Sequence, residues 1–359
     1  MFSRSLLRSK PRNISRTKRA IQKYPRFNFN GRYQHTNNKM TPIITLEEHY
    51  VSAAIRNASE IDHYARFPSQ IVSKLNTLAT ERLQDLDNGH VSLQVISHGP
   101  GAQPPHLCQA ANDELASAIS ANPTRFAGFA LLPMAEPALA ARELERCITQ
   151  HQGFVGALID NHTNGQFYDD RKFWPVFEKA QELDVPIYIH PSYPDEDTGA
   201  AAHYRGNYDV RIADALGAYG WGWHSDTALS ILRLYAAGLF DTYPNIKIII
   251  GHMGEMLPFQ LERVIAIASR FGRERGLRDV WTQNIWVTTS GMFALAPLAC
   301  LLQTMPIERV LYSVDYPFSA NEKGYAFLEE IKKSGLIKEG EEWEKFLYKN
   351  AQELLKVKV

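Results

Sequence analysis

Short apolar runs alternate with stretches of helical spacing from Thr41 to the end of the chain. The runs are rich in Val, Ile or Leu, which is typical of strands buried on both faces. They are Ile43–Glu47, Val91–Ser97, Phe126–Leu132, Phe154–Asp160, Val185–His190, Ile246–Ile250, Ile285–Ser290 and Val310–Val314. Helical patterns cover Asn112–Ala121, Asp170–Leu183, Thr227–Leu239, Leu257–Phe271 and Glu342–Val357.

Eight strand-and-helix repeats in residues 41–359 predict a single (β/α)8 barrel of the TIM type, enlarged by insertions. An open doubly wound sheet is the alternative, and it is less favoured because no Gly-rich phosphate fingerprint follows the first run. The longest insertions follow the first and fifth runs. Pro191–Gly222 is rich in aromatic residues. After a barrel strand it is expected on the C-terminal face, either walling an aromatic pocket or forming a subunit contact.

Charge and cysteine content narrow the class of protein. Lys plus Arg and Asp plus Glu both number 39, so the formal net charge is zero. Neither nucleic acid nor an anionic membrane is expected as a partner. No uncharged apolar run approaches the roughly 20 residues of a membrane span. Cys108, Cys147 and Cys300 are scattered, which argues against a disulfide scaffold or a thiolate metal site and fits a reducing compartment.

Residues 1–40 differ from the rest of the chain. They carry eleven Lys or Arg residues, and no acidic residue precedes Glu47. A basic, Ser-containing, acid-free leader resembles a mitochondrial transit peptide. The alternatives are a disordered basic tail or a start at Met40. The protein is therefore expected in the cytoplasm or in mitochondria.

Polar residues collect where the predicted strands end. The first run ends in Glu47, Glu48 and His49. Residues two apart in a strand share a face, so Glu47 and His49 are expected to face the barrel mouth while Glu48 points away. His190 ends the fifth run, and Asp315 follows the eighth.

In a barrel these strand ends converge on one mouth. Glu47, His49, His190 and Asp315 then form an N/O ligand set suited to Zn or Mn. A lone His at a strand end can be an ordinary satisfied polar residue, and an Asp there can be a helix cap. Their joint placement in apolar surroundings, where an unpaired charge costs several kcal/mol, favours a metal centre.

Further polar residues have candidate roles beside this centre. His252, just after the sixth run, is expected to act as acid or base, with Glu255 orienting it. Arg263 on the following helix could grip a carboxylate bidentately or be a solvated charge. His98 is either a core residue or part of the pocket lining, and His224 either contacts a substrate or caps a helix.

Four segments carry a family resemblance. Leu46–His49, Ile187–Pro191, Gly251–Phe259 and Ser313–Phe318 resemble the amidohydrolase-related decarboxylases. That group includes enzymes for 2,3-dihydroxybenzoate, γ-resorcylate, salicylate and 5-carboxyvanillate, with aminocarboxymuconate decarboxylase a more distant relative. The resemblance runs from about Thr41 to Ala351. Because Glu47 stands where distant relatives have the first His of a His-x-His motif, the chain resembles the hydroxybenzoate enzymes most.

The resemblance also implies roles for residues. Glu47, His190 and Asp315 match metal ligands, and His49 matches a residue that binds the metal in some relatives. His252 and Glu255 match a pair near the substrate. Arg263 matches an Arg that helps to hold the substrate, and Phe318 matches an aromatic residue that packs on its ring.

The expected function is thus non-oxidative decarboxylation of an ortho-hydroxylated aromatic acid, such as 2,3-dihydroxybenzoate or salicylate, to CO2 and a phenol or catechol. One divalent ion is expected, Zn first with Mn or Mg as alternatives, and no organic cofactor. Asp315 or His252 would protonate the ring carbon before CO2 leaves. Relatives are homodimers or homotetramers, which is the expectation here. A metal-dependent lactonase or amidase is the rival function, and an inactive binding barrel is a second.

Overall fold

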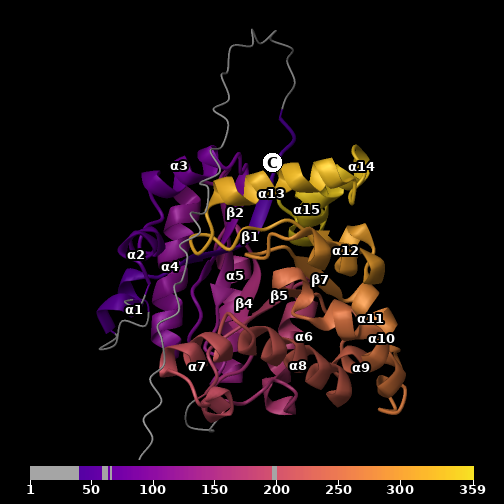
Figure 1. Cartoon of the computed structure of the whole chain (residues 1–359). Helices are drawn as coiled ribbons and strands as arrows, with labels where there is room; N and C mark the ends of the chain where they lie inside the picture. The colour runs from indigo at the N-terminus through magenta and orange to yellow at the C-terminus, as the bar shows by residue number, and fades with distance from the viewer. Residues whose placement is uncertain (1–39, 59–63, 65–66, 196–199) are drawn as a thin grey trace, which may run out of the picture. The chain divides into compact units, whose positions relative to one another are not determined.

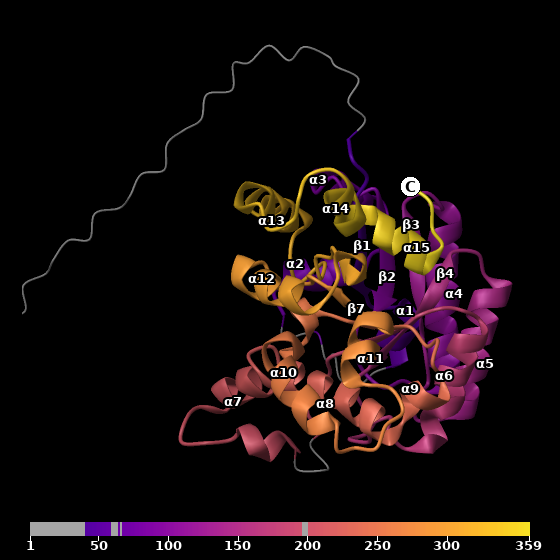
Figure 2. The same ribbon diagram turned by 90° about the vertical axis from the view of Figure 1, so that its right-hand side faces the viewer.

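Eight parallel strands follow one another around a barrel in the order β1 to β8 (Figures 1 and 2). The structure is a computed structural model that describes residues 40–58, 64, 67–195 and 200–359. The predicted leader therefore lies outside the described residues except for Met40. The strands are β1 Ile44–Tyr50, β2 Leu93–His98, β3 Phe126–Leu131, β4 Phe154–Asp160, β5 Ile187–His190, β6 Ile248–Ile250, β7 Ile285–Thr288 and β8 Val310–Leu311. All eight predicted strands and the barrel fold are confirmed.

Helices surround the strands, and consecutive helices pack against one another. In the two views α4, α5 and α6 cover one side of the barrel, and α10, α11 and α12 cover another (Figures 1 and 2). The helices are α1 Ala53–Ala58, α2 Ser69–Leu75, α3 Thr80–Asn88, α4 Pro105–Ala121, α5 Pro137–Gln150, α6 Trp174–Glu182, α7 Val210–Gly217, α8 Gly222–Ala237, α9 Leu239–Thr242, α10 Leu257–Ala268, α11 Leu277–Gln283, α12 Leu295–Thr304, α13 Asn321–Ser334, α14 Glu341–Glu344 and α15 Asn350–Leu355.

The predicted helices are present with shifted ends. Gly238, in the left-handed conformation at φ 89°, ends α8 before the predicted Leu239. The single predicted helix over Glu342–Val357 is instead α14, a π-helical turn over Lys345–Lys349, and α15. Of the helices in the described residues, none combines the length and apolarity that a bilayer crossing needs.

Apolar side chains fill the barrel in one cluster and pack the strands against the helices in another. The interior cluster includes Leu46, Val95, Phe129, Leu158, Tyr188 and Ile249. Leu354 and Leu355 of α15 belong to the same cluster, so α15 packs on the barrel core. In Figure 1, α15 lies at the end of the barrel opposite α7. The C-terminal ends of the strands are thereby left for the site.

Side chains, rather than a long ladder, join β8 to β1. Ser313 Oγ accepts hydrogen bonds from the backbone N–H groups of Leu46 and Glu47 at 3.1 and 3.0 Å. Ser313 Oγ also donates to Glu48 Oε1 at 2.9 Å. The Glu48 carboxylate accepts from Val314 N at 3.1 Å and from Tyr316 N at 2.8 Å. Glu48, fully buried, is therefore a structural link across this seam.

Candidate active site

Three buried side chains from two strands bring their ligand atoms together at the barrel mouth. Glu47 and His49 lie in β1, and His190 ends β5. The candidate ligand atoms of all three lie within 4.8 Å of one another. His190 Nε2 is 3.2 Å from Glu47 Oε1, and the rings of His49 and His190 meet edge to face at 4.8 Å. Three of the four ligands expected from the sequence thus form one cluster.

A bulge in β1 turns Glu47 into the barrel. Ile44 and Leu46 belong to the interior cluster, so strict alternation would place Glu48 inside next. The register against β2 instead shifts between Thr45 and Glu48, as at a β-bulge. Glu47 consequently faces the interior, and Glu48 turns to the seam with β8. The sequence-based expectation that Glu47 and His49 face the barrel mouth therefore agrees with the structure, but the bulge, and not regular alternation from Ile44 and Leu46, turns Glu47 inward.

The carboxylate of Glu47 is held on one side only. Its Oε2 accepts hydrogen bonds from Tyr188 Oη and, at 3.2 Å, from Thr288 Oγ1. A Cβ at Gly251 would lie 2.6 Å from the same oxygen, so this position needs a glycine. Oε1 faces the imidazoles of His190 and His252, whose Nε2 atoms lie 3.2 and 3.6 Å away. Tyr188 was missed in the sequence, although it stands two residues before His190 and therefore shares its face.

Hydrogen bonds at Nδ1 leave Nε2 of both histidines available as ligand atoms. His190 Nδ1 lies 2.6 Å from the carbonyl oxygen of Pro191, which can only accept, so Nδ1 carries the proton. His49 Nδ1 lies 3.3 Å from Ser97 Oγ. Imidazole ligands of metals are commonly oriented in this way through their second nitrogen.

The cluster fits a divalent cation. Glu47 Oε1 and His49 Nε2 are buried and have no hydrogen-bond partner in the part of the chain that the structure describes. Leaving such atoms unpaired is costly, and a cation would satisfy both. Burial alone would raise the pKa of Glu47, but His252, His190 and His49 hold it well below its usual range. An anionic oxygen beside two imidazole nitrogens is a donor set for Zn or Mn.

Asp315, the fourth expected ligand, lies beside the cluster. Its Oδ1 is 3.5 Å from His49 Nε2, and its side chain is 17% exposed. The backbone of Asp315 is left-handed, with φ 69°. A Cβ at Gly291 would come within 3.0 Å of Oδ2, so the glycine leaves room for this carboxylate. Asp315 is therefore placed to join the ligands or to exchange a proton beside them.

His252 and Glu255, which the sequence suggested as an acid and its orienting partner, lie in contact, and His224 joins them as a third member. His252 Nδ1 lies 2.7 Å from Glu255 Oε1, and His224 Nδ1 lies 2.7 Å from Glu255 Oε2. Burial would lower the pKa of His252, but the negative charges of Glu255 and Glu47 raise it to about 10. Burial would raise the pKa of Glu255, but His252 and His224 lower it. A buried carboxylate thus holds an imidazolium beside the ligand cluster.

An unusual backbone presents this pair. His252, Met253, Glu255 and Met256 all have positive φ, at 47°, 57°, 53° and 68°. Non-glycine residues rarely adopt this conformation, and runs of it cluster at functional sites. The turn lets His252 and Glu255 both project from the short segment between β6 and α10.

Aromatic side chains border the cluster on the β8 side. The Phe318 ring lies 5.8 Å from that of His49, and Phe67 lies 5.0 Å from Phe318. Phe67 had no signal in the sequence because it stands between α1 and α2, in a stretch without periodic apolar spacing. Arg263 is exposed on α10, and no hydrogen bond or ion pair within the described residues joins it to the cluster. Its expected contact with substrate stays a prediction.

His98, for which two interpretations were open, lines a small cavity beside the cluster. Its Nε2 lies 3.1 Å from the Ser52 N–H, and its Nδ1 lies 2.8 Å from the Gly99 carbonyl oxygen. The ring is therefore fixed by the backbone on both sides. It is both a satisfied buried residue and part of a pocket wall.

Comparison with known proteins gives consistent matches. The family model described as Amidohydrolase matches residues 75–357. A curated relative, the decarboxylase orsB of Emericella nidulans, is 46% identical over 88% of this chain and 97% of its own length. The dihydroxybenzoic acid decarboxylase of Polaromonas sp. JS666, solved with manganese and 2-nitroresorcinol, has a TM-score of 0.75 and 32% identity over 88% of this chain and 97% of its own. A 2,6-dihydroxybenzoate decarboxylase solved with 2,6-dihydroxybenzoate has a TM-score of 0.76 and 28% identity, covering 89% of this chain and all of its own.

Proposed function

The chain belongs to the amidohydrolase family and is a metal-dependent decarboxylase of hydroxylated aromatic acids, and we propose that its substrate carries a hydroxyl ortho to the carboxylate. Acids of the 2,3-dihydroxybenzoate or salicylate type meet this description. The observation that carries the proposal is the pair of unpartnered atoms, Glu47 Oε1 and His49 Nε2, beside the His252–Glu255 pair. This arrangement supports a bound cation that holds the anionic group of the substrate next to a proton donor.

We assign the metal to Glu47, His49, His190 and Asp315, with Zn as the first choice and Mn or Mg as alternatives. When bound, the ion supplies positive charge that holds and polarises the acid. Because the Polaromonas enzyme was solved with manganese bound, Mn is a strong alternative to Zn as the ion at this site. No organic cofactor has a role in this chemistry.

The chain's own residues supply the proton. Direct loss of CO2 would leave an aryl carbanion, so the ring carbon that bears the carboxylate is protonated first. The proton comes from the network of Asp315, His252 and Glu255, in which His252 is the imidazolium. The carbon–carbon bond then breaks, its electron pair restores the aromatic ring, and CO2 leaves. In total, the aromatic carboxylate takes up one proton and is converted to the arene and one molecule of CO2.

Phe318 and Phe67 provide an apolar wall for the ring. Arg263 remains a proposed contact for the substrate. The experiment for substrate type measures CO2 release from salicylate, 2,3- and 2,6-dihydroxybenzoate, orsellinate and 5-carboxyvanillate, with 3- and 4-hydroxybenzoate as isomers that lack the ortho hydroxyl. Turnover of acids with an ortho hydroxyl, and none of the isomers without it, is expected. Metal-loaded protein that releases no CO2 from any of them but opens lactones would favour the hydrolase function instead.

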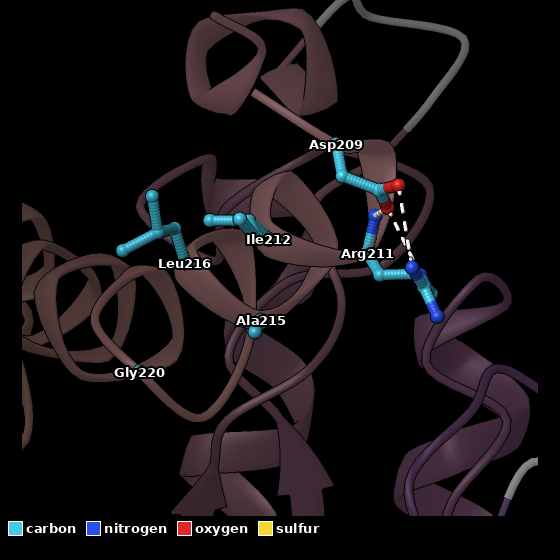
Figure 3. Close-up of a pocket in the computed structure, with 6 residues that line it drawn as sticks. All are labelled: Asp209, Arg211, Ile212, Ala215, Leu216 and Gly220. Atoms are coloured by element: carbon cyan, nitrogen blue, oxygen red, sulfur yellow. Dashed lines mark hydrogen bonds and ion pairs between the residues drawn. The ribbon is translucent and has the colours of Figure 1, made fainter. Parts of the chain in front are cut away.

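We also propose that the protein is a homodimer or homotetramer that contacts its copies through α7. Val210, Ile212 and Leu216 on this helix are exposed, and so are Tyr219 and Trp221 just after it. An open pocket of about 400 Å³ lies along the helix, and Figure 3 shows Ile212 and Leu216 beside the Asp209–Arg211 ion pair. Exposed apolar patches of this kind are typical of subunit contacts. Light scattering on Ile212→Glu would show smaller particles if α7 is the contact.

For residues 1–40 we propose mitochondrial targeting, on the basis of their basic, acid-free composition. A reporter fused to residues 1–40 should enter mitochondria, and a fusion with the arginines replaced by glutamine should not. Cytoplasmic retention of the first fusion would contradict the proposal.

A further inference from the structure

Asp315 lies on a strained turn beyond the end of its strand. The β8 strand ends at Leu311, so Asp315 stands outside the ladder of the sheet. Its φ of 69° lies in the left-handed region, which residues other than glycine keep only where the surrounding structure holds them. Asp315 Oδ1 lies 3.5 Å from His49 Nε2, and both must stay in place to bind one ion. Contacts beyond the ladder therefore have to fix this turn.

The Glu48 carboxylate brackets the turn. It accepts hydrogen bonds from the backbone N–H groups on either side of Asp315, with Val314 N 3.1 Å from Oε1 and Tyr316 N 2.8 Å from Oε2. Ser313 Oγ donates to Oε1 at 2.9 Å. Because Glu48 is fully buried, these hydrogen bonds are shielded from competition by water. The two oxygens of one carboxylate thus hold a peptide group before Asp315 and a peptide group after it.

Glu48 also stands between two members of the ligand cluster. Glu47 and His49 flank it in β1, and the β-bulge turns its side chain to the seam with β8. The backbone N–H of His49 donates to the carbonyl oxygen of Tyr316 at 2.6 Å, which adds a second tie between the two segments. Both the backbone and the Glu48 side chain therefore fix the turn of Asp315 to the strand that carries Glu47 and His49.

We infer that Glu48 is a positioning residue that holds Asp315 in the arrangement needed to bind the ion. Its carboxylate faces the seam and acts on the backbone of the turn, so its effect reaches the ion through Asp315. The inference rests on the proposed metal site, of which Asp315 is the fourth member. A residue with this role changes ion affinity only while Asp315 has a carboxylate to position.

Glu48→Gln tests this role by exchanging a single oxygen. The amide keeps one acceptor, but its NH2 group faces the N–H of either Val314 or Tyr316, and two donors cannot bond. We expect the affinity of the full chain for Zn²⁺, measured in competition with a chromophoric chelator, to fall about ten- to a hundredfold, the usual effect of losing a group that orients metal ligands.

A second background shows whether Asp315 carries the effect. Asp315→Gly removes the carboxylate and accepts the positive φ without strain. In this background Glu48→Gln should change Zn²⁺ affinity by less than about twofold, because the group on which Glu48 acts is gone. Tyr188→Phe acts on Glu47 instead, so its effect and that of Glu48→Gln should combine independently.

Asn350→Asp is the matched control for stability. Asn350 is buried in α15, and its Nδ2 donates to the carbonyl oxygens of Ile307 and Val310 at 2.6 and 2.9 Å. It holds the start of β8, whereas Asp315 follows the end of that strand. The exchange also sets like groups against each other, so it should lower the urea midpoint. It should leave Zn²⁺ affinity unchanged at a pH where every variant is folded.

Three results would overturn the positioning role and leave the metal site standing. They are unchanged Zn²⁺ affinity in Glu48→Gln, an equal loss with and without the Asp315 carboxylate, and a loss of the same size in Asn350→Asp. A wild type with no measurable affinity for Zn²⁺ or Mn²⁺ would overturn the proposed metal site and the inference with it. If Glu48→Gln does not fold, Glu48→Asp, whose carboxylate is one methylene shorter, is held to the same expected result.

Discussion

Nε2 of His252 lies 3.6 Å from Oε1 of Glu47. The same carboxylate oxygen lies 3.2 Å from His190 Nε2 in the ligand cluster. One atom therefore touches both the proposed metal site and the proposed proton donor. We propose that this proximity lets the site bind the acid's carboxylate and deliver the proton a short distance away.

Replacing His252 should separate binding from chemistry. His252→Asn keeps a polar side chain but removes the acid, so CO2 release should fall by roughly 10²- to 10⁴-fold, the usual contribution of general acid catalysis. Bound metal, measured by mass spectrometry, should stay near the wild-type content. Loss of metal together with activity would instead make His252 a ligand.

His224 should act through Glu255. Its Nδ1 holds Glu255 Oε2 at 2.7 Å, so His224→Phe frees one end of the carboxylate that orients His252. We expect kcat to fall about tenfold through poorer positioning, with a smaller change in KM. His224→Gln, which can still donate to Glu255, should recover part of the loss. Equal loss in both variants would argue against a role in positioning.

The meeting of Glu47, His49 and His190 could be predicted from the sequence because strand ends converge in any barrel. Each of these residues ends a buried apolar run, so the fold alone brings them together, whereas their role as metal ligands stays a prediction. The contact of His224 with Glu255 was not predictable in the same way, because His224 reaches the site from α8, beyond a long insertion. Phe67 likewise stands in a stretch of sequence that carries no periodic apolar signal.

The contacts that join β8 to β1 could not be predicted from the sequence either. A run of apolar residues over Val310–Val314 predicts a strand, yet the ladder covers only Val310–Leu311. The Ser313 hydroxyl instead accepts a hydrogen bond from Leu46 N in β1 and donates one to the Glu48 carboxylate. The bulge in β1 that frees Glu48 for this contact leaves no mark in the hydrophobic pattern.

Stability should depend on pH through Glu48. Burial, only partly offset by hydrogen bonds from Tyr316 and Val314, raises the pKa of Glu48 to about 7, above its usual value of 4.5. The folded state then binds more protons than the unfolded state between these values, so stability falls as pH rises from about 4.5 to 7. The full effect is up to roughly 3 kcal/mol. Denaturation from pH 4.5 to 8 should show this slope in the wild type and a flatter one in Glu48→Gln. Parallel slopes would contradict the assignment.

Arg82 should support His49 from behind. It is fully buried, and its guanidinium donates to the backbone carbonyl of His49, to Gln94 Oε1 at 3.0 Å and to the carbonyl of Thr77 at 3.1 Å. Arg82→Met would leave these acceptors unpaired, at about 1–3 kcal/mol each. Urea denaturation should show the loss, and metal affinity should weaken as His49 shifts. Arg211→Met, an exposed ion-paired arginine on α7, is the matched control and should change stability little.

The most direct test of the central claim is CO2 release measured together with metal content on one sample of the purified full chain. The protein should hold about one divalent ion and release CO2 from an ortho-hydroxylated benzoate. Chelation should abolish release, and re-addition of Zn or Mn should restore it, whereas Glu47→Gln should neither bind the ion well nor release CO2. Full CO2 release from metal-free protein, or no release from metal-loaded protein with any of these acids, would contradict the central claim.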